Sequence, residues 1–417
     1  MSEMKFEESM VTDPYSIPLD GDCDVARGKL FQQNLHEAWF DRLRAEDPVH
    51  YCENSKFGPY WSVTKYDDIL HVDKNNKIFS SEPTIVIDNV QEDFPLPMFI
   101  AMDQPKHDEQ RATVSPVVQP VNLAKMEGLI RERIAEILDS LPIGEEFDWV
   151  DKVSIELTTQ MLATLFDFPF EERRKLTRWS DVATSAPGDG VVESEDARRA
   201  ELFECLEYFS KLFRERVGKT GGDLITMLAN GESTKDLVDR PAELLGNLIL
   251  LIVGGNDTTR NSISGGVLAL NQFPAEYEKL RKNHKLINSL VPEIIRWQTP
   301  LTHMRRLATQ DTEIGGKKIK AGDKVVMWYV SGNRDETAIE RPRELVIDRK
   351  TPRQHLSFGF GIHRCMGNRL AEMQLRVTWE EIMKRFDWVE VVGEPERTLH
   401  TLIKGYTHLP VVLHAKK

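Results

Sequence analysis

The chain has 417 residues and a formal net charge of −13 at pH 7, and this acidic balance argues against nucleic acid as a partner. Its four cysteines are scattered and form no CxxC pair, which argues against a disulfide framework or a zinc site and fits a reducing, cytosolic compartment. The length exceeds that of one usual hydrophobic core, so composition alone predicts two domains.

The N-terminal part of the chain predicts an irregular lead over residues 1–40 with no membrane anchor. Residues 1–10 carry several charged side chains and lack the apolar segment of a signal peptide. The longest apolar stretch of the sequence, residues 244–253, is too short to span a bilayer. Alternation over residues 61–64, after the turn-forming pair at 58–59, predicts a strand.

Residues 82–100 are rich in proline and apolar side chains, which is unusual for a solvated loop. They form either a loop packed on the core or the roof of a binding pocket. Residues 121–230 are charged and periodic, and they predict several surface helices. The sequence Ala-Pro-Gly-Asp-Gly at 186–190 interrupts this pattern and predicts a mobile connection.

A long helix is predicted from about residue 239 to residue 272, because Asp239 followed by Pro241 and Glu243 is a helix-start signal. Its middle, Gly-Gly-Asn-Asp-Thr-Thr at 254–259, disfavours helix and predicts a local opening or kink. The alternative is one helix that ends at the glycines and a second that begins after them.

Two further segments, residues 310–330 and 399–414, predict short strands, the latter around a turn at 404–405. Together with the helices, they predict a fold that is mainly α with small antiparallel β-sheets.

Cys365 lies in the most distinctive segment of the chain, Phe-Gly-Phe-Gly-Ile-His-Arg-Cys-Met-Gly-Asn-Arg-Leu-Ala at 358–371. Gly359 and Gly361 can adopt positive φ and bring the backbone close to a flat ligand. Apolar residues then recur at helical spacing, so the thiol lies near a helix N-terminus, where free N–H groups favour an anionic sulfur. A thiolate held in this way is a natural axial ligand for haem iron, whereas a lone cysteine near glycines is more commonly a buried structural residue.

This segment resembles the haem-binding signature of cytochrome P450 monooxygenases, Phe-Gly-x-Gly-x-His/Arg-x-Cys-x-Gly followed by Leu-Ala, with every fixed position filled. The resemblance implies a single haem domain over residues 1–417, mainly helical with a smaller sheet-rich lobe, and no reductase module. It implies haem b with Cys365 as the iron ligand, O2 as co-substrate, and Phe358, Gly359 and Gly367 as cofactor-binding residues.

The middle of the long helix matches the family's Ala/Gly-Gly-x-Asp/Glu-Thr-Thr segment. The resemblance implies a groove beside the iron, in which Thr258 holds water or the iron-bound oxygen and Asp257 relays protons from solvent. Haem propionates need cationic donors, and a guanidinium suits a carboxylate well. The anchors that the resemblance implies are His107, Arg111, Arg306 and His363.

Glu293 and Arg296 lie three residues apart on one predicted helix face, between apolar neighbours. They match the family's Glu-x-x-Arg pair, which braces the fold around the haem-binding loop, although most such pairs in proteins are solvated and contribute little. The resemblance adds Arg343 as a third partner. Pro292 is expected in the first turn of this helix, with one of residues 288–289 as the cap.

The segments 101–107, 255–263 and 355–363 resemble the bacterial branch of the family that hydroxylates terminal methyl groups of medium-chain alkanes and fatty acids. Bacterial steroid side-chain hydroxylases carry a similar sequence and are the alternative. Family geometry suggests an apolar substrate pocket, although each of its candidates is plain core under the simpler interpretation. The candidates are Ile85, Val86, Leu250, Leu251, Val253, Gly254, Leu301, Met304, Met327 and Leu402.

No glycine-rich dinucleotide-binding segment follows a predicted strand. The resemblance therefore implies electrons from NAD(P)H through a separate ferredoxin reductase and ferredoxin, and we expect a cytoplasmic monomer. A basic patch that docks an acidic ferredoxin is predicted around the cysteine segment, from Arg353, Arg364, Arg369 and Arg376. Two other classes of function stay open: a haem protein that does not oxygenate, and a helical interaction scaffold without haem.

Overall fold

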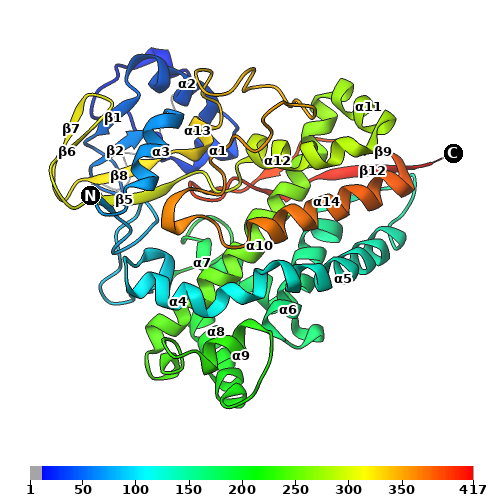
Figure 1. The fold of residues 1–417 in the computed structure, drawn as a ribbon. Coiled ribbons are helices and arrows are strands. Elements are labelled where there is room, and N and C mark those ends of the chain that lie inside the picture. The colour runs from blue at the N-terminus through cyan, green and yellow to red at the C-terminus, as the bar shows by residue number, and fades with distance from the viewer. Residues whose placement is uncertain (1–11, 417) are drawn as a thin grey trace.

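The computed structural model describes residues 12–416, and helices dominate them (Figure 1). The helices are α1 (Gly28–Gln32), α2 (His36–Glu46), α3 (Tyr66–Lys74), α4 (Lys106–Val114), α5 (Pro120–Asp139), α6 (Glu156–Phe166), α7 (Arg174–Thr184), α8 (Glu195–Arg216), α9 (Leu224–Asn230), α10 (Pro241–Gln272), α11 (Pro274–Lys282), α12 (Ile287–Gln298), α13 (Tyr329–Gly332) and α14 (Asn368–Arg385). None of these helices is both long enough and apolar enough to cross a membrane.

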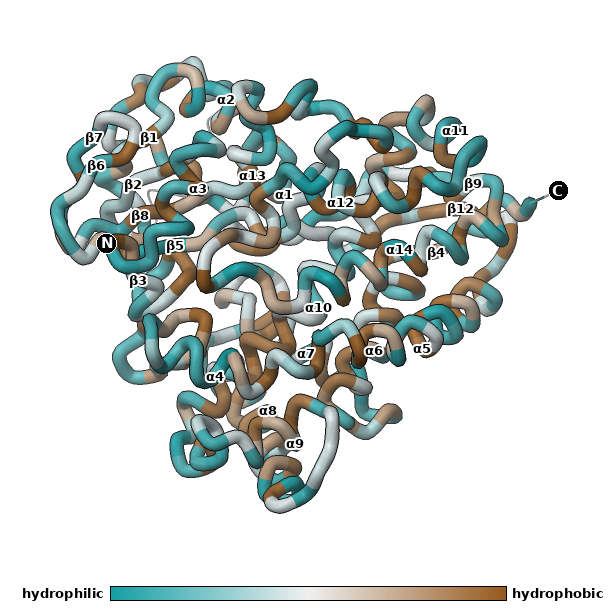
Figure 2. Tube along the Cα trace, in the orientation of Figure 1, coloured by the Kyte–Doolittle hydropathy of each residue, from teal (hydrophilic) through white to brown (hydrophobic). Residues whose placement is uncertain are grey.

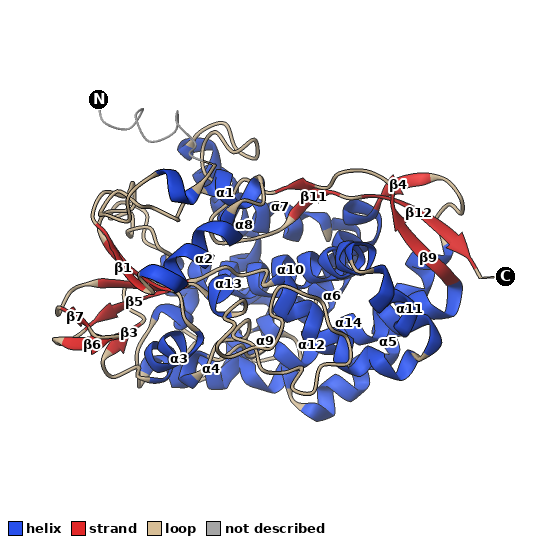
Figure 3. Cartoon of the chain, turned by 90° about the horizontal axis from the view of Figure 1, so that it is seen from above, coloured by secondary structure: helices blue, strands red, loops and turns tan. Residues whose placement is uncertain are grey.

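Strands gather at the two ends of the molecule, with the helices between them (Figure 3). One sheet has the order β1-β2-β8-β5-β3, another the order β4-β12-β9, and β6–β7 and β10–β11 form two-stranded pairs. The pair β2–β8 is parallel and all the others are antiparallel. The strands are β1 (Val49–Cys52), β2 (Tyr60–Val63), β3 (Phe79–Ser80), β4 (Glu146–Asp148), β5 (Met304–Ala308), β6 (Thr312–Ile314), β7 (Lys317–Ile319), β8 (Lys324–Met327), β9 (Phe386–Val391), β10 (Glu396–Arg397), β11 (Tyr406–His408) and β12 (Pro410–Ala415).

These elements confirm the prediction of a mainly α fold with small sheets. The strand predicted at 61–64 is β2, and the segment 310–330 forms β6, β7 and β8. In the segment 399–414, only the part after the predicted turn forms strands, β11 and β12, and β11 pairs with β10 instead of residues 399–403. The single-domain organisation stays a prediction.

The five-stranded sheet separates two hydrophobic clusters because successive side chains of a strand point to opposite faces. On β8, Val325 and Met327 enter one cluster and Val326 enters the other. A third and larger cluster fills the helical part around α10, where hydrophobic residues concentrate (Figure 2). The helical part and the sheet part therefore have distinct cores.

Helix α10 is unbroken from Pro241 to Gln272, and the predicted opening at 254–259 does not interrupt it. The alternative of two successive helices is also wrong. Polar side chains in this stretch bond back to the helix itself: the Thr258 hydroxyl donates to the Gly254 carbonyl at 3.0 Å, and the Asn261 amide donates to the Asp257 carbonyl at 2.8 Å. Burial against several neighbouring elements outweighs the low helix propensity of this sequence.

The segment 81–98 lies directly on α10, without helix or strand of its own. A Cβ at Gly246 would come within 2.1 Å of the Pro97 carbonyl oxygen, so only glycine permits this close approach. Ile85 and Ile87 of the segment are buried, and together with their neighbours they line a large cavity. The segment is thus both packed on the core and part of a cavity wall.

The Glu293 carboxylate is completely buried and holds two arginines. Arg296 donates to it at 2.8 Å and Arg349 at 3.0 Å, and the backbone N–H of Val346 donates at 2.8 Å. The prediction of Arg343 as third partner is wrong, because its exposed side chain pairs with Asp41 in α2. Residues 346 and 349 lie three apart in a loop, and both bind Glu293. The Glu-x-x-Arg motif at 293–296 does not specify these loop partners.

Pro292 is the sixth residue of α12 and lies in the helix interior, so the prediction that it occupies a first turn is wrong. The helix begins earlier, after Leu286, and the Ser289 hydroxyl donates to the carbonyls of Leu286 and Ile347 instead of capping the helix. The proline removes one helical hydrogen bond, and the dense burial of α12 compensates for the loss.

Arg349→Ala tests this buried cluster against Arg343→Ala as a matched control. We expect Arg349→Ala to lower the free energy of unfolding by about 2 kcal/mol, because it leaves a buried carboxylate with one cation fewer. Arg343→Ala should change it by less than about 0.5 kcal/mol, since exposed ion pairs contribute little. Urea unfolding followed by tryptophan fluorescence measures both variants, and equal losses would contradict the assignment.

Candidate functional site

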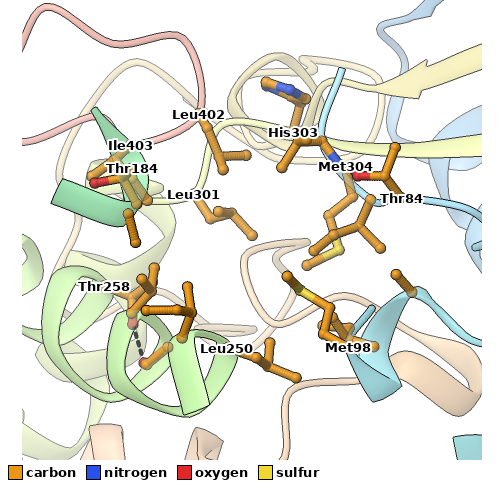
Figure 4. A pocket seen from close by; sticks show the side chains of 18 of the residues that line it. Thr84, Met98, Thr184, Leu250, Thr258, Leu301, His303, Met304, Leu402 and Ile403 are labelled. Atoms are coloured by element: carbon orange, nitrogen blue, oxygen red, sulfur yellow. Dashed lines mark hydrogen bonds between the residues drawn. The ribbon is translucent and has the colours of Figure 1, made fainter. Parts of the chain in front are cut away.

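A cavity of about 1770 Å³ is enclosed by α10, the segment 81–98, the cysteine segment and the loop at 399–403. Figure 4 shows part of its wall, where Leu250, Leu301 and Leu402 approach the cavity from three different elements. The wall also includes Cys365 and Thr258. Four chain segments that are distant in sequence therefore converge on one cavity.

Cys365 is held by a tight backbone loop ahead of α14. Its N–H donates to the Phe358 carbonyl at 2.8 Å, and Gly359 and Gly361 adopt φ of 62° and 67°. A Cβ at Gly361 would lie 2.5 Å from the Asp73 carbonyl oxygen, so the loop packs against α3 only because this residue is glycine. Helix α14 begins three residues after the cysteine. The sulfur is open to the cavity although it lies deep in the protein.

The surroundings of Cys365 combine burial with several electrostatic partners. Burial raises the pKa of the thiol, while the backbone N–H groups of Gly367 and Asn368 and the guanidinium groups of Arg111 and Arg364 act to lower its pKa. These donors stabilise the anionic form of sulfur, which is the form that binds iron. The loop therefore presents a sulfur suited to a metal ion inside the cavity.

The four predicted propionate anchors gather near this sulfur, but only three of them line the cavity: Arg111, Arg306 and His363. His107 packs behind, with its ring 4.3 Å from that of His363. Burial lowers the pKa of His363 to about 2, with Arg306 contributing, and burial also lowers the pKa of His107.

Several nitrogens in this group have no partner among residues 12–416. Both ring nitrogens of His363 and Nε2 of His107 are buried without a hydrogen bond. Buried polar atoms of this kind are rare and call for an acceptor. A carboxylate of a bound group meets that need, so the residues present fit the haem that the resemblance implies.

Asp73 is a partner that the sequence did not reveal. Its carboxylate accepts from Arg306 at 2.9 Å, from the Tyr329 hydroxyl at 3.2 Å and from the Phe360 N–H at 2.7 Å. It therefore joins α3, β5 and the cysteine segment beside the cavity. No motif surrounds Asp73, and its role follows only from the packing of α3.

Thr258 and Asp257 point in different directions from α10. Thr258 lines the cavity, and Figure 4 shows its hydrogen bond back into the helix. Asp257 is fully buried outside the cavity wall and pairs with Arg260 at 2.9 Å. Arg260 in turn pairs at 2.6 Å with Asp181 of α7, which is one-third exposed.

The pKa of Asp257 is raised to about 6, chiefly by burial; the charge of Arg260 acts to lower it and that of Asp181 to raise it. One carboxylate oxygen, Oδ2, has no hydrogen-bond partner among the described residues. The sequence predicted a role for Asp257 but not its connection through Arg260 to Asp181, because Asp181 is remote in sequence.

Nine of the ten predicted pocket residues line the cavity: Ile85, Val86, Leu250, Leu251, Val253, Gly254, Leu301, Met304 and Leu402. Met327 does not, so its assignment to the pocket is wrong. It lies between Val63 of β2 and Met304 of β5 in the sheet register and is completely covered. The sequence did not identify Thr84, Met98, Thr184 and Ile403, which also belong to the wall (Figure 4).

The predicted basic patch is reduced to two residues. Arg353 pairs with Glu372 at 2.8 Å, and Arg376 pairs with Glu127 and Glu380, each at 2.9 Å. Arg364 and Arg369 are exposed and form no ion pair with any residue in 12–416. These two cations flank the cysteine on the outer side of its loop.

Comparison with known proteins agrees with this geometry. The family model described as "Cytochrome P450" matches residues 196–410. The chain is 35% identical to linalool 8-monooxygenase of Pseudomonas putida, over 94% of this chain and 99% of that protein. It is 30% identical to methyl-branched lipid omega-hydroxylase of Mycobacterium tuberculosis, over 96% of each.

The fold also matches a solved structure, that of cytochrome P450-153 from Novosphingobium aromaticivorans. The TM-score is 0.88 and the sequence identity 46%, over 95% of this chain and 100% of the other. A haem-thiolate group and O2 are what this family uses. From its cysteine loop, its central helix and these similarities, the chain belongs to the cytochrome P450 family and is a monooxygenase.

Proposed function

We propose that this monooxygenase hydroxylates the terminal methyl group of medium-chain alkanes or fatty acids. The observation that carries the proposal is the apolar wall close to Thr258, formed by Leu250, Leu301, Met304 and Leu402. These four side chains are apolar and therefore suit a hydrocarbon chain. The similarity to an omega-hydroxylase of lipids supports terminal attack.

Each group of side chains around the cavity then has its own role in the reaction. The Cys365 thiolate would hold the haem iron, Arg111, Arg306, His107 and His363 would hold its propionates, and the bound haem would supply the activation of O2. The cavity wall excludes water and positions the hydrocarbon chain. The Thr258 hydroxyl is placed to orient a water molecule in the cavity.

Proton delivery is assigned to Asp257. A carboxyl group with a pKa of about 6 can both take up and release a proton near neutral pH. Its ion pair with Arg260, and that of Arg260 with the partly exposed Asp181, connects it to α7 near the surface. Electrons are expected from NAD(P)H through a separate reductase and a ferredoxin, which docks at Arg364 and Arg369.

The substrate class is tested by titrating the haem-loaded enzyme with octane, decanoate and cholest-4-en-3-one. We expect octane and decanoate to shift the Soret band and to give terminal alcohols with a surrogate ferredoxin and reductase. A Soret shift and product with the steroid alone would overturn the proposal in favour of a steroid side-chain hydroxylase.

Asp257→Asn tests the buried carboxyl group through the pH dependence of stability. The folded-state pKa of about 6 lies above the unfolded value, so the native state binds the proton more tightly and gains stability as the pH falls. Relative to the variant, the wild type should gain about 1 kcal/mol of unfolding free energy between pH 7 and pH 5. Urea unfolding at both pH values measures this difference, and parallel profiles would contradict the raised pKa.

Charge reversal tests the docking surface. Arg364→Glu or Arg369→Glu should slow reduction of the haem by ferredoxin about tenfold at low salt. High salt should make the difference in rate between each variant and the wild type smaller, because salt screens electrostatic steering. Arg353→Glu is the control, since that side chain is already paired with Glu372. Stopped-flow reduction measures all three, and equal rates would exclude this surface.

A further inference from the structure

The outer wall of the cavity carries positive charge without a carboxylate partner. Arg27, Lys29 and Lys56 line the cavity, and none of them forms an ion pair with a residue in 12–416. Lys29 and Lys56 are exposed, and Arg27 is partly exposed, so the cavity reaches the surface at this point. Cys365 lines the same cavity.

The three cations come together around the loop at 399–403. A Cβ at Gly28, between Arg27 and Lys29, would lie 3.3 Å from Leu399 and 3.4 Å from the His400 nitrogen. The charge of Lys56 acts to lower the pKa of His400 in the same loop, although burial is the main cause of that lowering. Leu399, His400 and Leu402 themselves line the cavity, so the charged wall continues directly into the apolar one.

Of the four other lysines and arginines that line the cavity, all but Arg111 are paired with a carboxylate. Arg198 pairs with Glu195 at 3.0 Å, Lys106 with Glu243 at 3.2 Å, and Arg306 with Asp73 at 2.9 Å. The chain has 67 acidic residues against 54 lysines and arginines, so carboxylates are abundant. Three neighbouring cations without a carboxylate are therefore unusual on this wall.

Two carboxylates of the cavity wall, Asp24 and Asp189, have local partners. Asp24 accepts from the Tyr60 hydroxyl at 2.7 Å and from the Ala26 N–H at 2.8 Å. Asp189 accepts from the backbone N–H groups at either end of its own turn. The charge on Arg27, Lys29 and Lys56 is thus available to a ligand.

We propose that Arg27, Lys29 and Lys56 bind the carboxylate of a medium-chain fatty acid, whose methyl end reaches toward Thr258 and Cys365. This inference rests on the proposed function and narrows its substrates from alkanes or fatty acids to fatty acids. A carboxylate needs cationic donors, which the three side chains supply. The alkyl chain needs an apolar wall, which the cavity supplies between these cations and Thr258. Anchoring the charged end would leave the methyl end of the chain to approach the sulfur, which agrees with the proposed terminal hydroxylation.

The test compares two ligands of equal chain length, dodecanoate and dodecan-1-ol, by Soret titration of the haem-loaded enzyme. The double variant Arg27→Gln/Lys56→Gln should raise the ratio of the acid Kd to the alcohol Kd by about fivefold or more, because only the acid carries the charge. Lys219→Gln, an exposed surface change, serves as the control and should leave the ratio unchanged. Added salt should weaken the binding of dodecanoate to the wild type more than that of dodecan-1-ol.

The outcomes separate this inference from the proposed function. If both ligands bind and give terminal oxidation but the ratio is the same in the double variant and the wild type, the carboxylate site is excluded and terminal hydroxylation stands. If neither ligand shifts the Soret band of the wild type, the proposed function itself fails. A Soret spectrum and haem content equal to those of the wild type establish that the double variant is folded.

Discussion

Keeping a sulfur anion inside the protein is the constraint on which the site depends. Burial alone raises the pKa of Cys365, so the fold must supply opposing groups: backbone N–H groups at the start of α14 and two arginines. The loop that brings them together is fixed by Gly361 against Asp73. Asp73 also binds Arg306 and Tyr329, so one buried carboxylate couples the sulfur loop to the sheet.

A second buried carboxylate supports the same region from the other side. Glu293 holds Arg296 and Arg349, and Arg296 also donates to the carbonyls of Asn333, Pro342 and Glu344. Asn333 in turn accepts from the N–H of Leu356, just ahead of the cysteine segment. The connection between β8 and the cysteine is long and largely without regular structure, and these bonds hold it in place.

Helix α10 separates the polar chemistry from the substrate space. Its face with Thr258 lines the cavity, while Asp257, one residue earlier, faces α7 and pairs with Arg260. Adjacent residues of a helix point about 100° apart, so one segment serves two environments. The residues of 254–259 have low helix propensity because they line the cavity on one face and form polar contacts with α7 on the other. Packing on both sides keeps the helix intact.

The sequence alone determined the residues whose roles are local: the glycines and thiol of 358–367, the Thr258–Asp257 pair, and the i, i+3 pair Glu293–Arg296, because short spacing fixes their relative positions. Only the tertiary structure decided which remote residues join them. Arg349 instead of Arg343, Asp73 beside Arg306, and the covered position of Met327 all depend on how distant segments pack, and no spacing along the chain encodes that contact.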